Sequence, residues 1–126
     1  MKDGPVQIKS FAFAMRIVNL YKHLSADKKE FVLSKQVLRS GTAVGALVRE
    51  AEQAESKADF VHKMAIALKE AKETEYWLLL LHRTDYIEEA AFGSIHRDMV
   101  ELIKLLTSII KSAKRNRKPN AERETG

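Results

Sequence analysis

Apolar side chains recur every three or four residues along almost the whole chain, which is the period of a helix that buries one face. The pattern occupies four segments, from about Ser10 to Leu24, from Ser34 to about Ala54, from Ser56 to about Arg83, and from beyond Asp85 to about Lys114. The 126 residues include only 5 glycines and 2 prolines, too few for the many turns of an all-β fold. Four amphipathic helices with short connections predict an all-α protein, an antiparallel up-down-up-down four-helix bundle.

Serine residues mark the expected starts of the first three helices. Ser10 and Ser34 are good N-caps, and Ser56 with Asp59 three residues later resembles a capping box. Residues 115–126 have one alanine as their only apolar side chain, and such a segment cannot offset the entropy of ordering. We therefore expect one bundle domain over residues 1–114 and a flexible charged tail over residues 115–126.

Composition excludes several classes of site. The chain has no cysteine, which rules out disulfides, iron–sulfur clusters, thiolate zinc sites and cysteine nucleophiles. The longest apolar block, residues 76–81, is far shorter than the roughly 20 residues of a membrane span. No apolar signal segment follows the N-terminus. These features predict a cytoplasmic protein.

Catalytic and metal-binding patterns are also missing from the sequence. No Gly-x-Ser-x-Gly elbow surrounds a serine. The Glu-x-x-His pairs of carboxylate-bridged metal bundles are absent, and the nearest spacing is that of Asp59 and His62. We expect no enzymatic activity, no metal and no cofactor.

Two glycines, Gly41 and Gly45, lie four residues apart on one face of the second helix. Each costs about 1 kcal/mol relative to alanine inside a helix, so the close approach of a neighbouring backbone is the expected compensation. A phosphate-binding loop is the alternative, but the glycine-rich patterns that accompany such a loop are absent.

Glu75 is a carboxylate on the apolar stripe of the third segment. An unpaired charge there would be costly, so we expect a salt bridge, with Arg39 or Arg49 of the second segment as its partner. Glu50 is the other acid that could pair with these arginines. The sequence leaves open whether the two arginines pair with acids or face a channel.

Basic residues concentrate in two places, within a chain whose formal net charge is +5. The first is a stripe on the second helix that contains three cations and no acid, made of Lys35, Arg39, Thr42, Ala46, Arg49 and Gln53. The second is a run of five cations near the C-terminus, Lys111, Lys114, Arg115, Arg117 and Lys118. Such features are either solvated faces or surfaces that contact phosphates. No aromatic residue interleaves the C-terminal run, so nucleic-acid binding there would be electrostatic and largely independent of base sequence.

Three stretches of the sequence carry a resemblance to a known family. They are residues 38–51, which contain the run Val44-Gly45-Ala46-Leu47-Val48, then residues 56–60 and residues 66–78. Together they resemble the bacterial four-helix-bundle family associated with intervening sequences in 23S rRNA genes, over roughly residues 9–110. Leu47 stands where that family usually has asparagine.

The resemblance implies a compact antiparallel bundle that assembles into a homopentamer, a ring with a central channel. The chain also resembles the accessory subunit of diversity-generating retroelements, a basic pentamer that binds nucleic acid and partners a reverse transcriptase. Two functions follow as hypotheses. The first is a homo-oligomer that binds RNA, DNA or a ribonucleoprotein through its basic surfaces, and the second is a protein-interaction scaffold that binds no nucleic acid. Salt-dependent retention on RNA would separate them.

Overall fold

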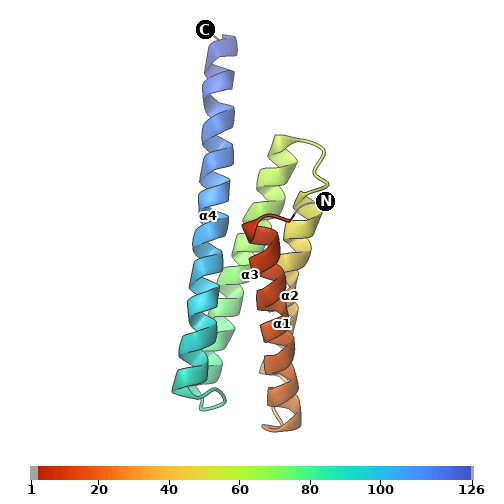
Figure 1. Ribbon diagram of the computed structural model, residues 1–126, viewed down its shortest axis with the longest axis vertical. Coiled ribbons are helices and arrows are strands. Elements are labelled where there is room, and N and C mark those ends of the chain that lie inside the picture. Colours follow the sequence, from red (N-terminus) through yellow and green to blue (C-terminus); the bar gives the residue numbers. More distant parts are fainter. Residues whose placement is uncertain (1–2, 126) are drawn as a thin grey trace.

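Four helices make up the computed structural model, which describes the backbone of residues 3–125 and the side chains of residues 3–116. They are α1 (Pro5–Ala26), α2 (Leu33–Ala51), α3 (Lys57–Arg83) and α4 (Glu89–Thr125). Successive helices run in opposite directions and are joined by short loops (Figure 1). The residues that the structure describes contain no strand. The predicted all-α, antiparallel four-helix bundle is confirmed.

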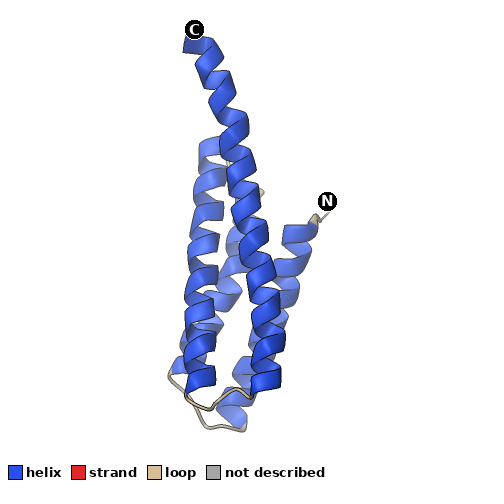
Figure 2. Cartoon of the chain, turned by 90° about the vertical axis from the view of Figure 1, so that its left-hand side faces the viewer, coloured by secondary structure: helices blue, strands red, loops and turns tan. Residues whose placement is uncertain are grey.

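The helices pack around one core in the order α1, α2, α3, α4. α2 lies between α1 and α3, and α4 packs mainly on α3, while the contact between α4 and α1 is less extensive. The backbones of α1 and α3 do not approach each other closely, so these two helices occupy diagonal positions in the bundle. α4 is the longest helix and rises past the ends of the other three (Figure 1, Figure 2).

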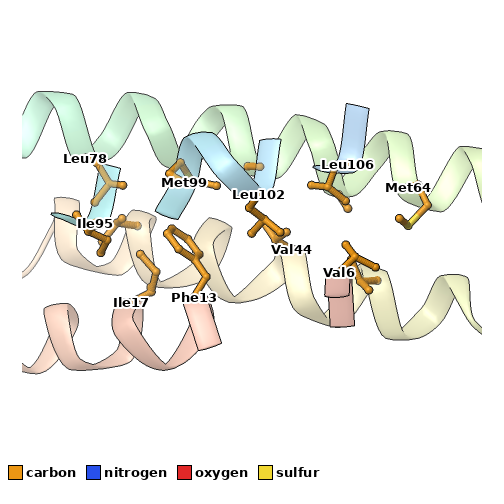
Figure 3. Close-up of a cluster of buried hydrophobic side chains, with 14 of the residues drawn as sticks. Val6, Phe13, Ile17, Val44, Met64, Leu78, Ile95, Met99, Leu102 and Leu106 are labelled. Carbon is orange, nitrogen blue, oxygen red and sulfur yellow. The ribbon is translucent and has the colours of Figure 1, made fainter. Parts of the chain in front are cut away.

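The core is a ladder of buried apolar side chains from all four helices. In Figure 3, Phe13 and Ile17 of α1 point toward Met99 and Leu102 of α4, with Val44 of α2 beside them. Full burial of an aliphatic or aromatic side chain of this size stabilises the fold by about 1.5–3 kcal/mol. The largest completely buried apolar side chains are Ile17, Leu24, Met64, Leu78, Leu81, Met99, Leu102 and Leu106.

Local chemistry moves the start of the first helix away from the prediction. α1 begins at Pro5, ahead of Ser10, because a proline at the first helical position needs no hydrogen bond from its nitrogen and has its φ preset. Ser10 lies inside the helix and is buried against α2. The prediction that Ser10 caps the first helix is therefore wrong.

The second helix begins at Leu33, and Glu30 caps it in place of the predicted Ser34. The carboxylate of Glu30 accepts hydrogen bonds from the backbone N–H groups of Val32, Leu33 and Ser34 at 3.3, 3.1 and 2.7 Å. Burial would raise the pKa of the Glu30 carboxyl, but these hydrogen bonds outweigh it and hold the pKa below its usual value. The carboxylate also faces the positive end of the helix dipole.

The third helix follows its prediction, whereas the fourth runs further than expected. The hydroxyl of Ser56 accepts the backbone N–H of Asp59 at 3.0 Å, and α3 ends at Arg83. α4 continues past Lys114 to Thr125. Apolar spacing marks where packing stops, while a helix already begun adds residues at little cost, so the predicted helix end is wrong. The flexibility of residues 115–126 stays a prediction.

No helix in the described part of the chain combines the length and the apolar character that a bilayer crossing requires.

Candidate nucleic-acid interface

The predicted basic stripe of α2 lies on the outside of the bundle. Lys35, Arg39, Ala46, Arg49 and Gln53 are exposed, and Thr42 is half-buried. The helical spacing therefore placed these residues on one outward face, as expected. What the spacing could not show is which side chains of the neighbouring segments reach this face.

Acids from α3 surround Arg39. Its guanidinium lies 3.3 Å from a carboxylate oxygen of Glu70 and forms a second ion pair with Glu73. Glu73 also accepts the indole N–H of Trp77 at 2.9 Å, which fixes the carboxylate in place beside Arg39. The charge of Arg39 is thus opposed by two carboxylates.

Arg49 is paired in the same way, by residues outside its own stripe. Its two terminal nitrogens donate to the two carboxylate oxygens of Asp3 at 2.8 and 3.1 Å, and Glu52 lies 3.6 Å away. The hydrogen bonds from Arg49 hold the pKa of Asp3 below its usual value and raise the pKa of Arg49. Two of the three cations of the α2 stripe are therefore neutralised within the chain.

The outward face of α4 carries cations in a different setting. Arg97, Lys104 and Lys111 follow one another at seven-residue intervals, and Arg115 continues the same face. All four are exposed, and none forms an ion pair with a side chain of residues 3–116. At 1.5 Å per residue, the face from Arg97 to Arg115 is about 27 Å long.

A shallow depression lies on the upper part of this face. Its lining contains no acid. It consists of Ile103, three cations and three hydroxyl side chains, which are Lys104, Lys111, Arg115, Thr107, Ser108 and Ser112. Cations and hydroxyl donors without a competing carboxylate are the groups that bind phosphate oxygens.

A second depression continues this basic face toward the start of α4. Lys104 lines both depressions, and the second adds Gly93, His96, Arg97, Val100 and Glu101. Glu101 is the one acid in that lining, and it lies 2.8 Å from the ammonium group of Lys9 on α1. We call the surface of Arg97, Lys104, Lys111 and Arg115 the α4 basic face.

Sequence reasoning found only the C-terminal part of this surface. Lys111, Lys114 and Arg115 are exposed on α4. Arg117 and Lys118 were predicted with them, but their side chains lie outside the described residues. Arg97 and Lys104 were missed because Asp98 and Glu101 stand close to them in sequence. The signal that could have found them is the seven-residue spacing of Arg97, Lys104 and Lys111, which places these cations on one helix face.

The predicted partners of Glu75 are wrong. Its carboxylate lies 2.9 Å from the Nε2 of His96 on α4, because Glu75 faces α4, whereas the two arginines are on α2. Glu50 likewise pairs with neither arginine and lies 3.3 Å from the ammonium group of Lys63. His96 is half-buried.

His96 belongs to a stack of three rings between α3 and α4. The Phe92 ring lies 5.1 Å from the His96 ring and 4.3 Å from the His82 ring, both nearly parallel to it. The Nδ1 atom of His82 lies 3.1 Å from the backbone carbonyl oxygen of Ile87. The stack fixes the N-terminal end of α4 against α3. Among the described side chains, no three histidines or carboxylates come together in a way that could hold a metal ion.

The two glycines of α2 lie where α2 crosses α1. A Cβ on Gly41 would lie 2.7 Å from a side-chain carbon of Ile17, and a Cβ on Gly45 would lie 3.3 Å from the backbone carbonyl oxygen of Ser10. Both glycines are inside a continuous helix, so their geometry is that of close helix packing and not of a loop around a phosphate.

Comparison with known proteins places the fold. The family model of the 23S rRNA-intervening sequence protein matches residues 2–108. The chain belongs to this family. A 1.70 Å crystal structure of a protein with unknown function from the S23 ribosomal protein family of Bacteroides thetaiotaomicron is 63% identical in sequence. The two structures superpose with a TM-score of 0.83, and the alignment covers 84% of this chain and 98% of the Bacteroides chain. A comparison with curated proteins gave no match.

One residue inside the matched region and two residues beyond it bear on the site. Leu47, which stands where the resemblance expects asparagine, packs half-buried against the core. The match ends at residue 108, so Lys111 and Arg115 of the α4 basic face lie past it. Arg97 and Lys104 lie inside it.

Proposed function

We propose that this member of the family is a non-enzymatic, cytoplasmic homo-oligomer that binds RNA through the α4 basic face. The observation that carries the proposal is the acid-free depression of three cations and three hydroxyls on α4. The lining contains no aromatic ring on which a base could stack, so the contact is made to phosphates and tolerates many sequences.

The expected assembly, a pentamer by family resemblance, supports this function. Each copy adds one α4 basic face, and repetition around a symmetry axis converts a weak single contact into a tighter multivalent one. A surface of this kind also attracts a polyanion from a distance, with an effect that salt screens.

Binding of labelled RNA at increasing salt tests the proposal. Log affinity should fall linearly with log salt, and the triple variant Lys104→Gln, Lys111→Gln, Arg115→Gln should lower that slope by about 2–3, since each phosphate contact contributes roughly 0.7–0.9. The matched control removes three exposed cations elsewhere, with Lys28→Gln, Lys57→Gln and Lys69→Gln. Equal losses in both variants, or no binding by the wild type at roughly 50 mM salt, would contradict the proposal.

Labelled single-stranded RNA, duplex RNA and duplex DNA of equal length form the arms of the same experiment. Phosphate contact predicts binding to all three, with salt slopes that follow their charge density. Preference for one of them would show which backbone geometry the α4 basic face fits.

A further inference from the structure

The column of stacked rings between α3 and α4 ends in a ring face that no described aromatic side chain covers. His82 lies 3.0 Å from Glu89, which precedes Phe92 along α4, whereas His96 comes one helical turn after Phe92. The two histidines therefore stack on opposite faces of Phe92. The second face of His96 points along α4 in the direction of its C-terminal end, and the column is open there.

Contacts on two sides hold the His96 ring in a fixed orientation. Phe92 covers one face at a centroid distance of 5.1 Å, and a carboxylate oxygen of Glu75 on α3 lies 2.9 Å from Nε2. The side chain of His96 is nevertheless 35% exposed. A ring that is already fixed and has one free face is a platform on which a nucleobase can stack at little cost in side-chain entropy.

The free face of His96 belongs to the second depression on α4. Val100 supplies a half-buried apolar side chain one turn further along the helix. Gly93 adds no side chain beside the ring, and a Cβ there would meet no atom from outside its own stretch of helix within 4 Å. The flat ring, the apolar side chain and the open flank together suit a planar, uncharged group.

The two depressions on α4 differ in charge, and this difference assigns them different parts of a nucleic acid. The first contains no acid and suits phosphates. The second contains Glu101, which repels a phosphate, although Lys9 holds one of its oxygens at 2.8 Å. A neutral base is tolerated beside this carboxylate, and its amino group can donate to the other oxygen. Lys104 lines both depressions, so a base in the second adjoins phosphates in the first.

We propose that His96 stacks on a base of single-stranded RNA whose phosphates lie on the α4 basic face. This inference rests on the proposed function and adds a seat for a base to a surface that otherwise contacts only phosphates. The bases of a duplex are stacked on one another, so an unpaired strand is the form that can place a base on the ring. Because every base has a ring face, the seat accepts many sequences.

Fluorescence anisotropy with the full chain tests the seat. The probes are a labelled oligouridylate and an abasic strand with the same number of phosphates. Their salt slopes should be equal, while the affinity for the oligouridylate should be at least about fivefold higher, the lower end of the effect of one stacked base. Equal affinities would overturn the seat and leave the phosphate contacts in place. Absence of salt-dependent binding to either strand would overturn the seat and the proposed function together.

Two substitutions at His96 separate its ring from its hydrogen bond. His96→Phe keeps a ring and His96→Leu does not, and both lose the contact with Glu75. The preference for oligouridylate should persist in His96→Phe and disappear in His96→Leu. His62→Leu, at an exposed histidine of α3, is the matched control and should keep the preference. Loss of the preference in both His96 variants, or its retention in both, would overturn the role of the ring.

The phosphate contacts provide the remaining comparison. The Lys104→Gln, Lys111→Gln, Arg115→Gln variant should weaken binding of both strands by the same factor, since both carry the same phosphates. His96→Leu should instead lower the affinity for oligouridylate to that for the abasic strand and leave duplex RNA binding unchanged. Circular dichroism melts establish that each variant is folded, and the comparison of the two strands on the wild type decides the matter if His96→Leu unfolds.

Discussion

The outward faces of α2 and α4 both carry cations at helical spacing, and they differ in what surrounds them. Around the α2 stripe, Glu70 and Glu73 face Arg39, and Asp3 and Glu52 face Arg49. The depression on the α4 basic face has no acid in its lining. Acids of α3 and of the residues before α1 reach the surface of α2, whereas no described side chain forms an ion pair with the cations of the α4 basic face. Surface charge in a bundle is therefore decided by neighbouring helices as much as by the helix itself.

The inner side of α2 gives the first and largest expected effect. Gly45→Leu places a side chain against the backbone of Ser10, so we expect the free energy of unfolding to fall by about 2 kcal/mol, within the range of overpacked cores. Gly93→Leu on α4 is the matched control, since a Cβ there would meet no atom from outside its own stretch of helix within 4 Å, and it should raise stability by roughly 0.5–1 kcal/mol. Urea denaturation measures both; equal effects would remove the distinction between a packed α2 and an open α4.

The start of α2 depends on an ionised carboxylate, and acid should expose this dependence. The pKa of Glu30 is lower in the folded chain than its ordinary 4.5, so its contribution is complete above pH 4.5 and is lost as the pH falls through the folded value. Glu30→Ala should cost about 1–2 kcal/mol at pH 7, as for other lost helix caps. Its difference from the wild type should shrink below pH 4.5, as measured by urea denaturation at several pH values, and a difference independent of pH would contradict the capping role.

Removal of the acids around Arg39 should leave a cation on α2 available to phosphates, as the cations of the α4 basic face are. The double variant Glu70→Gln, Glu73→Gln leaves Arg39 without its partners, and we expect RNA affinity to rise about threefold to tenfold at low salt, since a further cation becomes available to phosphates. Asp85→Asn with Glu88→Gln changes the net charge equally at two exposed sites in the loop between α3 and α4. A rise of the same size in this control would mean that total charge, and not the release of Arg39, determines affinity.

The smallest expected effect is the change in the free energy of unfolding when one cation is removed from the α2 stripe or from the α4 basic face. Arg39→Gln breaks two ion pairs and should lower the free energy of unfolding by about 0.5 kcal/mol, the usual value of exposed pairs. Lys111→Gln breaks none among the described side chains and should change it by less than about 0.3 kcal/mol. Thermal melts of the two variants, each compared with the wild type, measure the contrast, which should vanish in high salt.

Local sequence signals predicted the fold well because they act over one or two helical turns. The apolar period gave four helices, and Ser56 with Asp59 marked the start of α3 correctly. The start of α2 was mistaken because a glutamate placed before the helix does the work usually done by a serine. The length of α4 was mistaken because apolar spacing reports packing and not helix formation.

The candidate site could be predicted only in part, because charge pairing is a property of the folded chain. The acids that neutralise Arg39 are 31 and 34 residues away in sequence, and the acid that binds Arg49 is 46 residues away. The partner of Glu75 was sought on the wrong helix for the same reason. The two glycines of α2 were easier to place, since an unfavourable residue inside a helix points by itself to a close neighbour.

The hydrogen bond between Trp77 and Glu73 gives the protein a built-in optical reporter. Trp77 is the only tryptophan of the chain, and the carboxylate that accepts its indole N–H is the one that pairs with Arg39. Any event that draws Arg39 away from Glu73 changes the charge beside the indole and therefore its emission. Fluorescence excited at the tryptophan band can thus follow the state of the α2 stripe without a label, while the α4 basic face, which holds no tryptophan, stays silent.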